Sequence, residues 1–254
     1  MIFLKSREEI EIIRAANRIV AEVHAAVREA VRPGVSTAEL DAIAEEGALR
    51  RGAKPAFKGY RVGSSVFPAS LCTSVNEEVV HGIPSSGRIL REGDIIGLDF
   101  GVVYRGYYGD AAVTIAVGAI PEATRRLMEA TNEALHAGIE AARVGNRIGD
   151  VSASVQRVAE AAGFSVVRDF VGHGVGRNLH EEPQVPNYGP PSRGVPLQEG
   201  MVLAIEPMVN AGGPEVYLKD DGWTAVTADG SLSAHFEHSI AVTRNGPYIL
   251  STLE

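Results

Sequence analysis

The order of the predicted elements repeats along the chain, and this repetition restricts the fold more than any other feature of the sequence. A helical stripe of apolar residues covers about residues 6–31, and a second predicted helix covers about 36–51. A block of short strands follows, and the same order recurs after Pro121. We interpret the repeat as a duplication with halves of about 6–120 and 121–250. A coincidence between two alanine-rich helix pairs is the alternative.

Local signals bound the first helix at both ends. Ser6 and Glu9 form an S-x-x-E pattern, in which the hydroxyl and the carboxylate each accept a hydrogen bond from a free amide of the first turn. Pro33 and Gly34 end the helix, because proline has no amide hydrogen and glycine tolerates a left-handed backbone. The helix is therefore predicted to start directly after Ser6 and to stop before Pro33.

Composition excludes several classes of protein. The chain has 254 residues, 45% of them apolar, and a net charge of −8, which argues against a nucleic-acid-binding surface. Cys72 is the single cysteine, so we expect neither an intramolecular disulfide framework nor a cysteine-based zinc module. No apolar run reaches the roughly 18 residues of a membrane span, and the N-terminus lacks signal-peptide anatomy. We expect a cytoplasmic globular protein with no membrane or nucleic-acid partner.

A β-hairpin is predicted in the first β-rich block. Residues 95–104 and 107–115 have strand-like patterns, and a two-residue turn joins them. With that turn, Asp99 lies opposite Ala112, and Asp110 is two residues away from Ala112. Side chains two residues apart in a strand point to the same face, so the two carboxylates are predicted to be diagonal neighbours.

Four carboxylates lie within otherwise apolar strand segments. They are Asp99, Asp110, Glu206 and Glu237. A carboxylate in such a place must be exposed, hydrogen-bonded, protonated or bound to a cation. A single one is explained by exposure or hydrogen bonding, but four of them in two β-rich blocks favour a shared cation site.

His173 adds an imidazole to this set, between glycines that would let the backbone approach a bound ligand closely. Four carboxylates and one neutral imidazole carry a charge of about −4, which two divalent ions would balance. Ligation by many oxygens and one nitrogen suits Mn²⁺, Fe²⁺, Co²⁺ or Zn²⁺. Two such ions hold a hydroxide and polarise a carbonyl, so the residue types favour a hydrolase with a dinuclear metal centre.

Other catalytic motifs are absent from the sequence. It contains no H-E-x-x-H pair, no G-x-S-x-G nucleophile elbow and no G-x-G-x-x-G phosphate loop. A nucleophilic role for Cys72 is weaker than the alternative, a buried small hydrophobic side chain. The carboxylates and His173 remain the strongest indication of chemistry.

Several longer segments carry a family-specific pattern. They are residues 73–84 (TSVNEEVVHGIP), Asp99, 106–110 (GYYGD), 172–177 (GHGVGR), 179–183 (LHEEP), 206–207 (EP) and 237–238 (EH). With these segments, the chain resembles type I methionine aminopeptidases over nearly its whole length. The resemblance implies an α+β pita-bread fold, in which two pseudo-symmetric halves of a single catalytic domain, residues 1–254, surround a central dinuclear metal site.

The resemblance also implies a set of metal ligands. They are Asp99, Asp110, His173, Glu206 and Glu237, with Asp110 and Glu237 bridging both ions. The implied cofactors are two divalent ions per chain, with Co²⁺, Mn²⁺, Fe²⁺ and Zn²⁺ all compatible with these ligands.

The implied activity is metal-dependent removal of the N-terminal methionine from peptides and nascent proteins whose second residue is small. Glu206 matches the general base of the family. His180 matches the residue that contacts the substrate and stabilises the tetrahedral intermediate, and His81 matches the one that assists substrate binding and proton transfer. Both roles need an uncoordinated imidazole that donates a hydrogen bond near neutral pH. The alternative for His81 is a structural histidine in a turn.

The methionine pocket of the family is lined by aromatic and sulfur-containing side chains. The candidates here are Tyr60, Phe67, Cys72 and Trp223, with Phe57 as a further one. A pocket of this kind selects by fit, at about 1–3 kcal/mol per methylene.

The chain departs from the family pattern at this pocket. Many relatives have a Tyr-His-Gly-aromatic-Pro run where this chain has residues 60–68 (YRVGSSVFP). The insertion at 61–66 removes a histidine and places Arg61 at the predicted pocket rim. Leu179 stands where relatives often have phenylalanine. We expect an altered methionine pocket with unchanged metal chemistry.

Two other functions are compatible with the same fold. Prolidases and aminopeptidases P have the same five ligands but usually carry a large N-terminal domain, whereas the first catalytic helix here begins by about residue 6. A pita-bread binding module would have lost metal ligands, and all five are present.

About 30 residues separate Glu206 from Glu237, too few for the helical insert of type II relatives. We therefore expect a minimal bacterial-style domain, monomeric, with methionyl peptides, nascent chains and, through them, the ribosome near its exit tunnel as partners.

Overall fold

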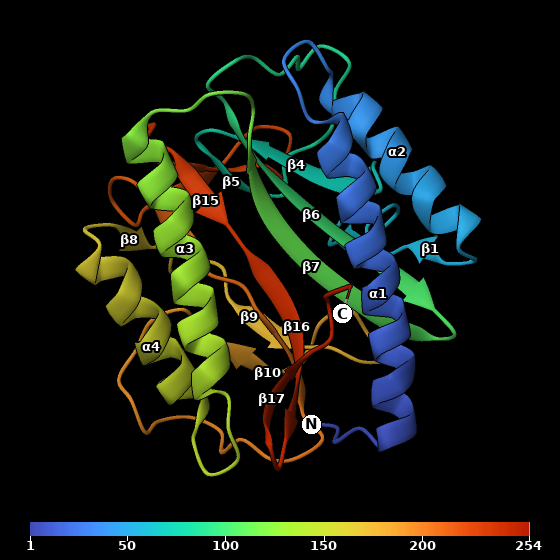
Figure 1. The fold of residues 1–254 in the computed structure, drawn as a ribbon, viewed down its shortest axis with the longest axis vertical. Helices are drawn as coiled ribbons and strands as arrows, with labels where there is room; N and C mark the ends of the chain where they lie inside the picture. The colour runs from blue at the N-terminus through green and yellow to red at the C-terminus, as the bar shows by residue number, and fades with distance from the viewer. Residues whose placement is uncertain (254) are drawn as a thin grey trace.

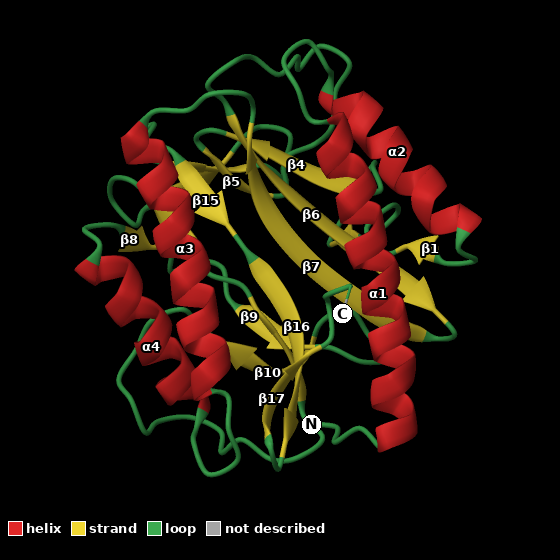
Figure 2. Cartoon of the chain, in the orientation of Figure 1, coloured by secondary structure: helices red, strands yellow, loops and turns green. Residues whose placement is uncertain are grey.

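The computed structural model describes residues 1–253 and contains four helices among them, arranged as two pairs (Figures 1 and 2). The helices are α1 (Arg7–Ala30), α2 (Thr37–Arg50), α3 (Glu122–Ala141) and α4 (Ile148–Ala161). Ser6 caps α1 with Glu9 in a capping box, as predicted, and Ser36 caps α2 in the same way with Glu39. Among the described residues, no helix is both long and apolar enough to cross a membrane.

An antiparallel nine-stranded sheet forms the centre of the molecule. Its strands are β1 (Lys54–Pro55), β4 (Leu71–Val75), β6 (Ile95–Tyr104), β7 (Tyr107–Ala116), β9 (Gly172–Gly174), β10 (Glu181–Val185), β11 (Val202–Ile205), β16 (Glu237–Thr243) and β17 (Gly246–Ile249). The strand order is β1-β6-β7-β16-β11-β9-β10, with β4 paired to β6 and β17 paired to β16. Strands from both β-rich blocks therefore meet where β7 pairs with β16.

Three small sheets surround the central one. The first contains β8 (Ser165–Val166), β12 (Met208–Asn210) and β15 (Ser233–His235), and the second contains β5 (Glu78–Val80), β13 (Val216–Leu218) and β14 (Ala225–Thr227). The third is the hairpin of β2 (Arg61–Val62) and β3 (Ser65–Val66). This last hairpin is formed by the inserted residues 61–66.

The hairpin of β6 and β7 has the predicted register. Tyr104 pairs with Tyr107 across the turn, Asp99 lies opposite Ala112, and Asp110 lies opposite Gly101. The two aspartates therefore share one face of the sheet, because residues two apart along a strand point to the same side.

Both helix pairs cover the opposite face of the sheet. Leu98 and Phe100 of β6 are fully buried in one cluster with Val20 and Val23 of α1. Since neighbouring side chains alternate along a strand, Asp99 points away from this helix. Figure 1 shows α1 over β6 and β7 with α2 beside it, and α3 beside β15 and β16 with α4 on its outer side.

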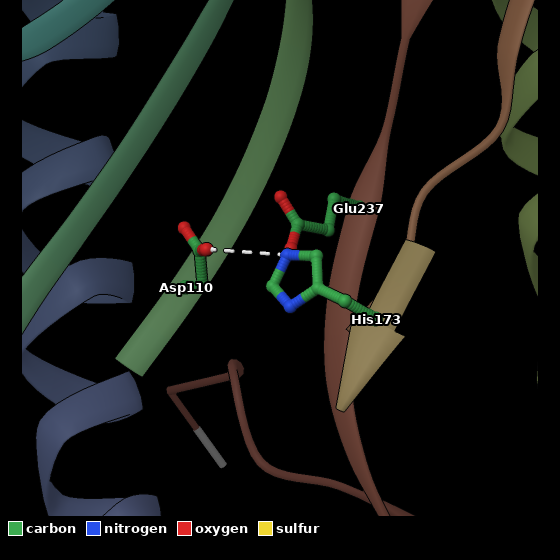
Figure 3. Close-up of side chains that lie close together, drawn as sticks. All are labelled: Asp110, His173 and Glu237. Carbon is green, nitrogen blue, oxygen red and sulfur yellow. Dashed lines mark ion pairs between the residues drawn. The ribbon is translucent and has the colours of Figure 1, made fainter. Parts of the chain in front are cut away.

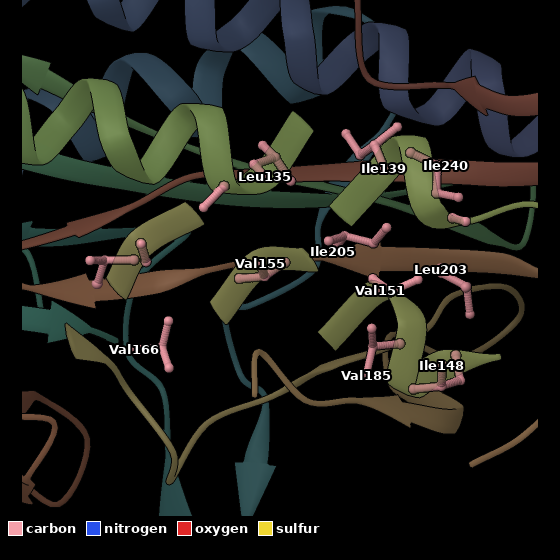
Figure 4. Packing of buried hydrophobic residues seen from close by; sticks show 14 of the residues in the cluster. Leu135, Ile139, Ile148, Val151, Val155, Val166, Val185, Leu203, Ile205 and Ile240 are labelled. Atoms are coloured by element: carbon pink, nitrogen blue, oxygen red, sulfur yellow. The ribbon is translucent and has the colours of Figure 1, made fainter. Parts of the chain in front are cut away.

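The second helix pair packs in the same way. Leu135 and Ile139 of α3 lie in one buried cluster with Leu203 of β11 and Ile240 of β16 (Figure 4). The register between β16 and β7 puts Ile240 on the helix-covered face, because His238 lies opposite Ala111. The other face of the central strands is left for polar side chains.

Helix α1 approaches strand β7 closely at Gly109. A Cβ atom at this position would lie 2.6 Å from the backbone nitrogen of Asn17. The buried Asn17 side chain bonds at both ends: its amide nitrogen donates to Ile13 O at 3.0 Å, and its oxygen accepts from Asp110 N–H at 3.1 Å. The helix thus fixes the backbone of the residue that carries the Asp110 carboxylate.

Gly109→Ala will destabilise the protein, because the new methyl group meets helix backbone that has no rotamer to change. We expect a loss of about 1–3 kcal/mol in the free energy of unfolding, which is typical of overpacking. Urea unfolding checks this value. Gly87→Ala is the matched control, since the nearest neighbour of its Cβ is Ser85 Oγ at 3.6 Å. Equal stability of the two variants would contradict the close approach.

Candidate metal centre

Five neighbouring strands bring the predicted ligands to one place. Asp99 lies on β6, Asp110 on β7 and Glu237 at the start of β16, while Glu206 follows β11 and His173 lies on β9. These strands are consecutive in the sheet, in the order β6-β7-β16-β11-β9. Residues from positions 99 to 237 of the chain therefore meet on the face that the helices leave uncovered.

The side chains of Asp110, His173 and Glu237 point toward one another (Figure 3). One ligand atom from each of these three residues lies within 4.8 Å of the other two, and the same is true of Glu206, His235 and Glu237. Glu237 belongs to both groups, so the two groups adjoin. This geometry suits two cation sites that share one carboxylate.

The orientation of His173 suits metal ligation. Its Nδ1 lies 2.9 Å from Gly174 O, and because a carbonyl only accepts, Nδ1 carries the proton. The lone pair is then on Nε2, which lies 3.4 Å from Glu206 Oε1 and 3.9 Å from Asp110 Oδ2. A backbone carbonyl that fixes the tautomer in this way is a usual partner of a metal-binding histidine.

The glycines beside His173 let strand β9 lie close to its neighbouring strands. A Cβ at Gly174 would meet the backbone oxygen of Glu182, and a Cβ at Gly172 would meet that of Ala204. Both glycines therefore allow β9 to pack between β10 and β11.

The acids are buried without enough polar partners. Asp99 Oδ1, Asp110 Oδ1 and Glu237 Oε1 have no hydrogen-bond partner. Burial raises the pKa of Asp99 to about 7 and that of Glu206 to about 8. Burial, followed by repulsion from the neighbouring acids, raises the pKa of Asp110 and of Glu237 well above the usual range. Unpaired, mutually repelling carboxylates are what a multivalent cation would neutralise, so the residues fit a metal centre.

His235 belongs to this cluster and was not predicted. Its Nε2 is buried, has no hydrogen-bond partner and lies 3.5 Å from Glu206 Oε2. Its backbone is held to β7 by Thr114, whose hydroxyl donates to His235 O at 2.8 Å. The sequence does contain a signal for His235: it lies two residues before Glu237, and residues two apart in an extended chain share a face.

The two predicted catalytic histidines lie in the wall of the same cavity as the acids. His81 has a left-handed backbone (φ 60°), and its ring meets Phe170 edge to face at 5.4 Å. Burial lowers the pKa of His81 to about 4. His180 contacts His173 with ring centroids 4.4 Å apart, and partial burial lowers its pKa as well. Both imidazoles are therefore neutral at pH 7 and keep a donor for hydrogen bonding.

The predicted methionine-pocket residues line this cavity too. It has a volume of about 200 Å³. Its walls include the predicted residues Phe57, Tyr60, Phe67, Cys72, Leu179 and Trp223, together with the unpredicted Val80, Phe170 and Met208. Phe67 and Trp223 meet edge to face with centroids 5.3 Å apart. One apolar chamber thus opens directly onto the cluster of acids.

Cys72 is a buried thiol rather than a nucleophile. It lies opposite Asp99 in the pairing of β4 with β6 and is 4% exposed. Burial, with the nearby acids, raises the pKa of the Cys72 thiol well above its usual value. A protonated thiol is a poor nucleophile, which agrees with a role as a small wall residue.

Residues 61–66 contribute Val62 to the cavity wall, a residue that was not predicted there. Arg61 is exposed and is not part of the cavity wall, whereas the neighbouring Val62 is. Neighbouring side chains of a strand point to opposite sides, so only one of them can face the chamber. The sequence alone does not show which side of β2 faces the chamber, and therefore which of the two residues lines it.

Comparison with known proteins agrees with this site. The model of metallopeptidase family M24 matches residues 11–244. The methionine aminopeptidase of Clostridium acetobutylicum is 51% identical over 254 residues, the full length of both chains. The crystal structure of the Thermotoga maritima methionine aminopeptidase has a TM-score of 0.96 at 48% identity, covering 99% of this chain and 100% of that one.

The structure of a prolidase is also similar to this chain, but less so than that of the methionine aminopeptidase. The Pyrococcus horikoshii prolidase has a TM-score of 0.78 at 27% identity, and the match covers 99% of this chain but 64% of the prolidase. These structural matches confirm the predicted pita-bread fold, and the family model covers most of the sequence. The chain therefore belongs to metallopeptidase family M24.

Proposed function

We propose that this chain is an aminopeptidase that removes the N-terminal methionine from peptides and nascent proteins when the second residue is small. One observation carries the proposal: the cluster of buried acids and His173 lies in the wall of an apolar chamber of about 200 Å³. The full-length relatives named methionine aminopeptidase support the same activity. A chamber of this kind accepts an unbranched apolar side chain and holds the adjoining peptide bond beside the acids.

We propose Asp99, Asp110, His173, Glu206 and Glu237 as the residues that would hold two divalent ions. Membership of a metallopeptidase family supports the use of divalent metal. Co²⁺, Mn²⁺, Fe²⁺ and Zn²⁺ all accept such oxygen-rich ligands. Ions bound there would polarise the peptide carbonyl and make a water molecule more acidic.

Three side chains carry out the remaining steps, which are proton transfer and hydrogen bonding to the substrate. Glu206 accepts the proton of the attacking water, since its carboxylate lies within the cluster, 3.4 Å from His173 Nε2. His180 donates a hydrogen bond to the substrate carbonyl as negative charge develops on its oxygen. His81 assists proton transfer to the leaving amine.

We propose Tyr60, Phe67, Cys72 and Trp223 as the walls that contact the methionine side chain. Phe67 and Cys72 are buried, and Trp223 supports Phe67 edge to face. Aromatic rings and sulfur atoms attract one another by about 0.3–1.5 kcal/mol, which favours methionine over leucine of similar size.

Further proposals concern the protein as a whole. We propose one catalytic domain, residues 1–254, built from related halves of about 6–120 and 121–250. The two helix pairs on one face of a shared sheet support this division. We propose a cytoplasmic monomer that meets its substrates as they leave the ribosome.

Peptide cleavage tests the proposed function. Metal-stripped protein, and protein reloaded with Co²⁺, Mn²⁺, Fe²⁺ or Zn²⁺, is incubated with Met-Gly, Met-Ala, Met-Leu and Ala-Pro peptides. We expect metal-dependent release of methionine from Met-Gly and Met-Ala, with Met-Leu spared. Preference for Ala-Pro would transfer the assignment to the prolidases, and absence of cleavage with every metal would reject an enzymatic role.

A further inference from the structure

The hydroxyl group of Tyr60 makes a contact that a simple pocket wall does not require. Its oxygen lies 2.7 Å from Nδ1 of His180. The two rings meet edge to face, with centroids 5.4 Å apart. A methionine side chain would pack against the tyrosine ring alone, so the contact with His180 points to a second role for Tyr60.

The backbone holds Tyr60 in place for this contact. Its N–H donates to Phe57 O at 2.8 Å, and its carbonyl accepts from Phe67 N–H at 2.9 Å. These bonds lie at the base of the β2–β3 hairpin, directly before the inserted residues 61–66. The tyrosine ring therefore extends from a fixed point of the chain.

The segment before His180 is anchored as well. Glu181 accepts hydrogen bonds from the backbone N–H groups of Arg177 and Asn178 at 2.8 and 3.1 Å. Its other carboxylate oxygen pairs at 2.5 Å with Nζ of Lys5, and both side chains are 5% exposed. The turn that presents His180 is thus fixed on one side by Glu181 and on the other by Tyr60.

The direction of the hydrogen bond follows from the chemistry of the two groups. The phenol is a good donor, and the lone pair of a neutral imidazole nitrogen is a good acceptor. Burial raises the pKa of Tyr60, so the phenol keeps its proton at neutral pH. A proton donated to Nδ1 leaves the ring's own proton on Nε2.

We infer that Tyr60 is a positioning residue, whose hydroxyl donates to His180 Nδ1 and thereby holds His180 in the tautomer protonated on Nε2. The catalytic consequence rests on the proposed function. In this tautomer, Nε2–H is available as a donor to the substrate carbonyl. In the other tautomer, a lone pair on Nε2 would face the carbonyl oxygen and repel its growing charge.

Tyr60→Phe tests the inference, because it removes the hydroxyl and keeps the ring. We expect kcat for methionine release from a Met-Ala peptide to fall about 3- to 10-fold, the value of one hydrogen bond, with KM within twofold of the wild type. The substitution should have no effect on kcat in a His180→Ala background. Tyr104→Phe is the control, since Tyr104 lies at the tip of the β6–β7 hairpin, and its activity should equal the wild type.

A spectroscopic measurement separates positioning from a general structural effect. Two-bond ¹H–¹⁵N correlation spectra of the Zn²⁺-loaded protein report the tautomer of each histidine, and His180→Ala assigns the signals of His180. We expect a single Nε2–H tautomer in the wild type and in Tyr104→Phe, and a mixture of tautomers in Tyr60→Phe.

The outcomes distinguish this inference from the proposed function. An Nδ1–H tautomer in the wild type, or an unchanged tautomer and kcat in Tyr60→Phe, would overturn the role of Tyr60. A raised KM with unchanged kcat would also overturn it and would leave Tyr60 as a pocket wall. A tautomer that responds to Tyr60→Phe in a protein that releases no methionine would support the positioning role and reject the proposed function.

Discussion

Glu206→Gln will lower kcat for methionine release by about 10³-fold, within the range that general bases contribute. The amide has nearly the size of the carboxylate but cannot accept the proton of the attacking water. Glu206 also lies 3.4 Å from His173 Nε2 within the cluster of acids, so its loss weakens metal binding too. Initial rates of methionine release from a Met-Ala peptide at saturating Mn²⁺ measure this change in kcat.

The loss should be catalytic rather than structural. Glu206 is a buried acid whose pKa is raised to about 8 by burial, so a neutral amide will not destabilise the metal-free fold. Glu46→Gln on the exposed surface of α2 is the matched control and should keep wild-type activity. Activity of Glu206→Gln within tenfold of the wild type would show that another group accepts the proton.

Metal-free protein will lose stability as the pH rises from 7 to 8.5. In the unfolded chain the carboxylates have pKa values near 4 and are fully charged throughout this range. In the folded chain burial raises the pKa of Asp99 to about 7 and that of Glu206 to about 8, and burial, followed by repulsion from neighbouring acids, raises the pKa values of Asp110 and Glu237 well above the usual range. The folded state therefore binds more protons, and the free energy of unfolding falls as pH rises.

The protons retained by Asp99 and Glu206 alone give a decrease on the order of 1.5 kcal/mol over this range, at about 1.36 kcal/mol per pH unit for each fully retained proton, and Asp110 and Glu237 add to it. The buried histidines offset only part of it, because they are neutral in the folded state and, with a pKa near 6.5, already mostly neutral in the unfolded chain above pH 7. Saturating Mn²⁺ should abolish the decrease, since bound cations stabilise the charged carboxylates. Urea unfolding with and without Mn²⁺ measures both trends, and metal-free stability that stays level or rises would contradict the assigned burial of the acids.

The sequence predicted those parts of the site that depend on local patterns. The two-residue turn after Tyr104 sets the register of β6 and β7, and that register alone brings Asp99 and Asp110 to one face. The capping residue Ser6 likewise sets where α1 begins. Turn length and capping act over a few residues, so they can be recognised without knowing the rest of the fold.

Long-range packing determines the parts of the site that local sequence patterns do not predict. The place of His235 beside Glu206 depends on how β15 and β16 meet β7 and β11, across more than one hundred residues of sequence. The role of the glycines beside His173 depends on which strands flank β9. The choice of Val62 over Arg61 as a wall residue depends on which side of β2 faces the chamber. Residue spacing alone does not determine which strands lie beside one another.

The central claim is that the buried acids form a dinuclear metal centre on which methionine release depends. Titration of metal-stripped protein with Mn²⁺, with bound ions and released methionine measured in the same samples, tests it most directly. We predict no release without metal, increasing release as up to two ions bind per chain, and loss of both ions and activity in Asp110→Asn. Full methionine release without bound ions, or unchanged Mn²⁺ binding in Asp110→Asn, would contradict the account.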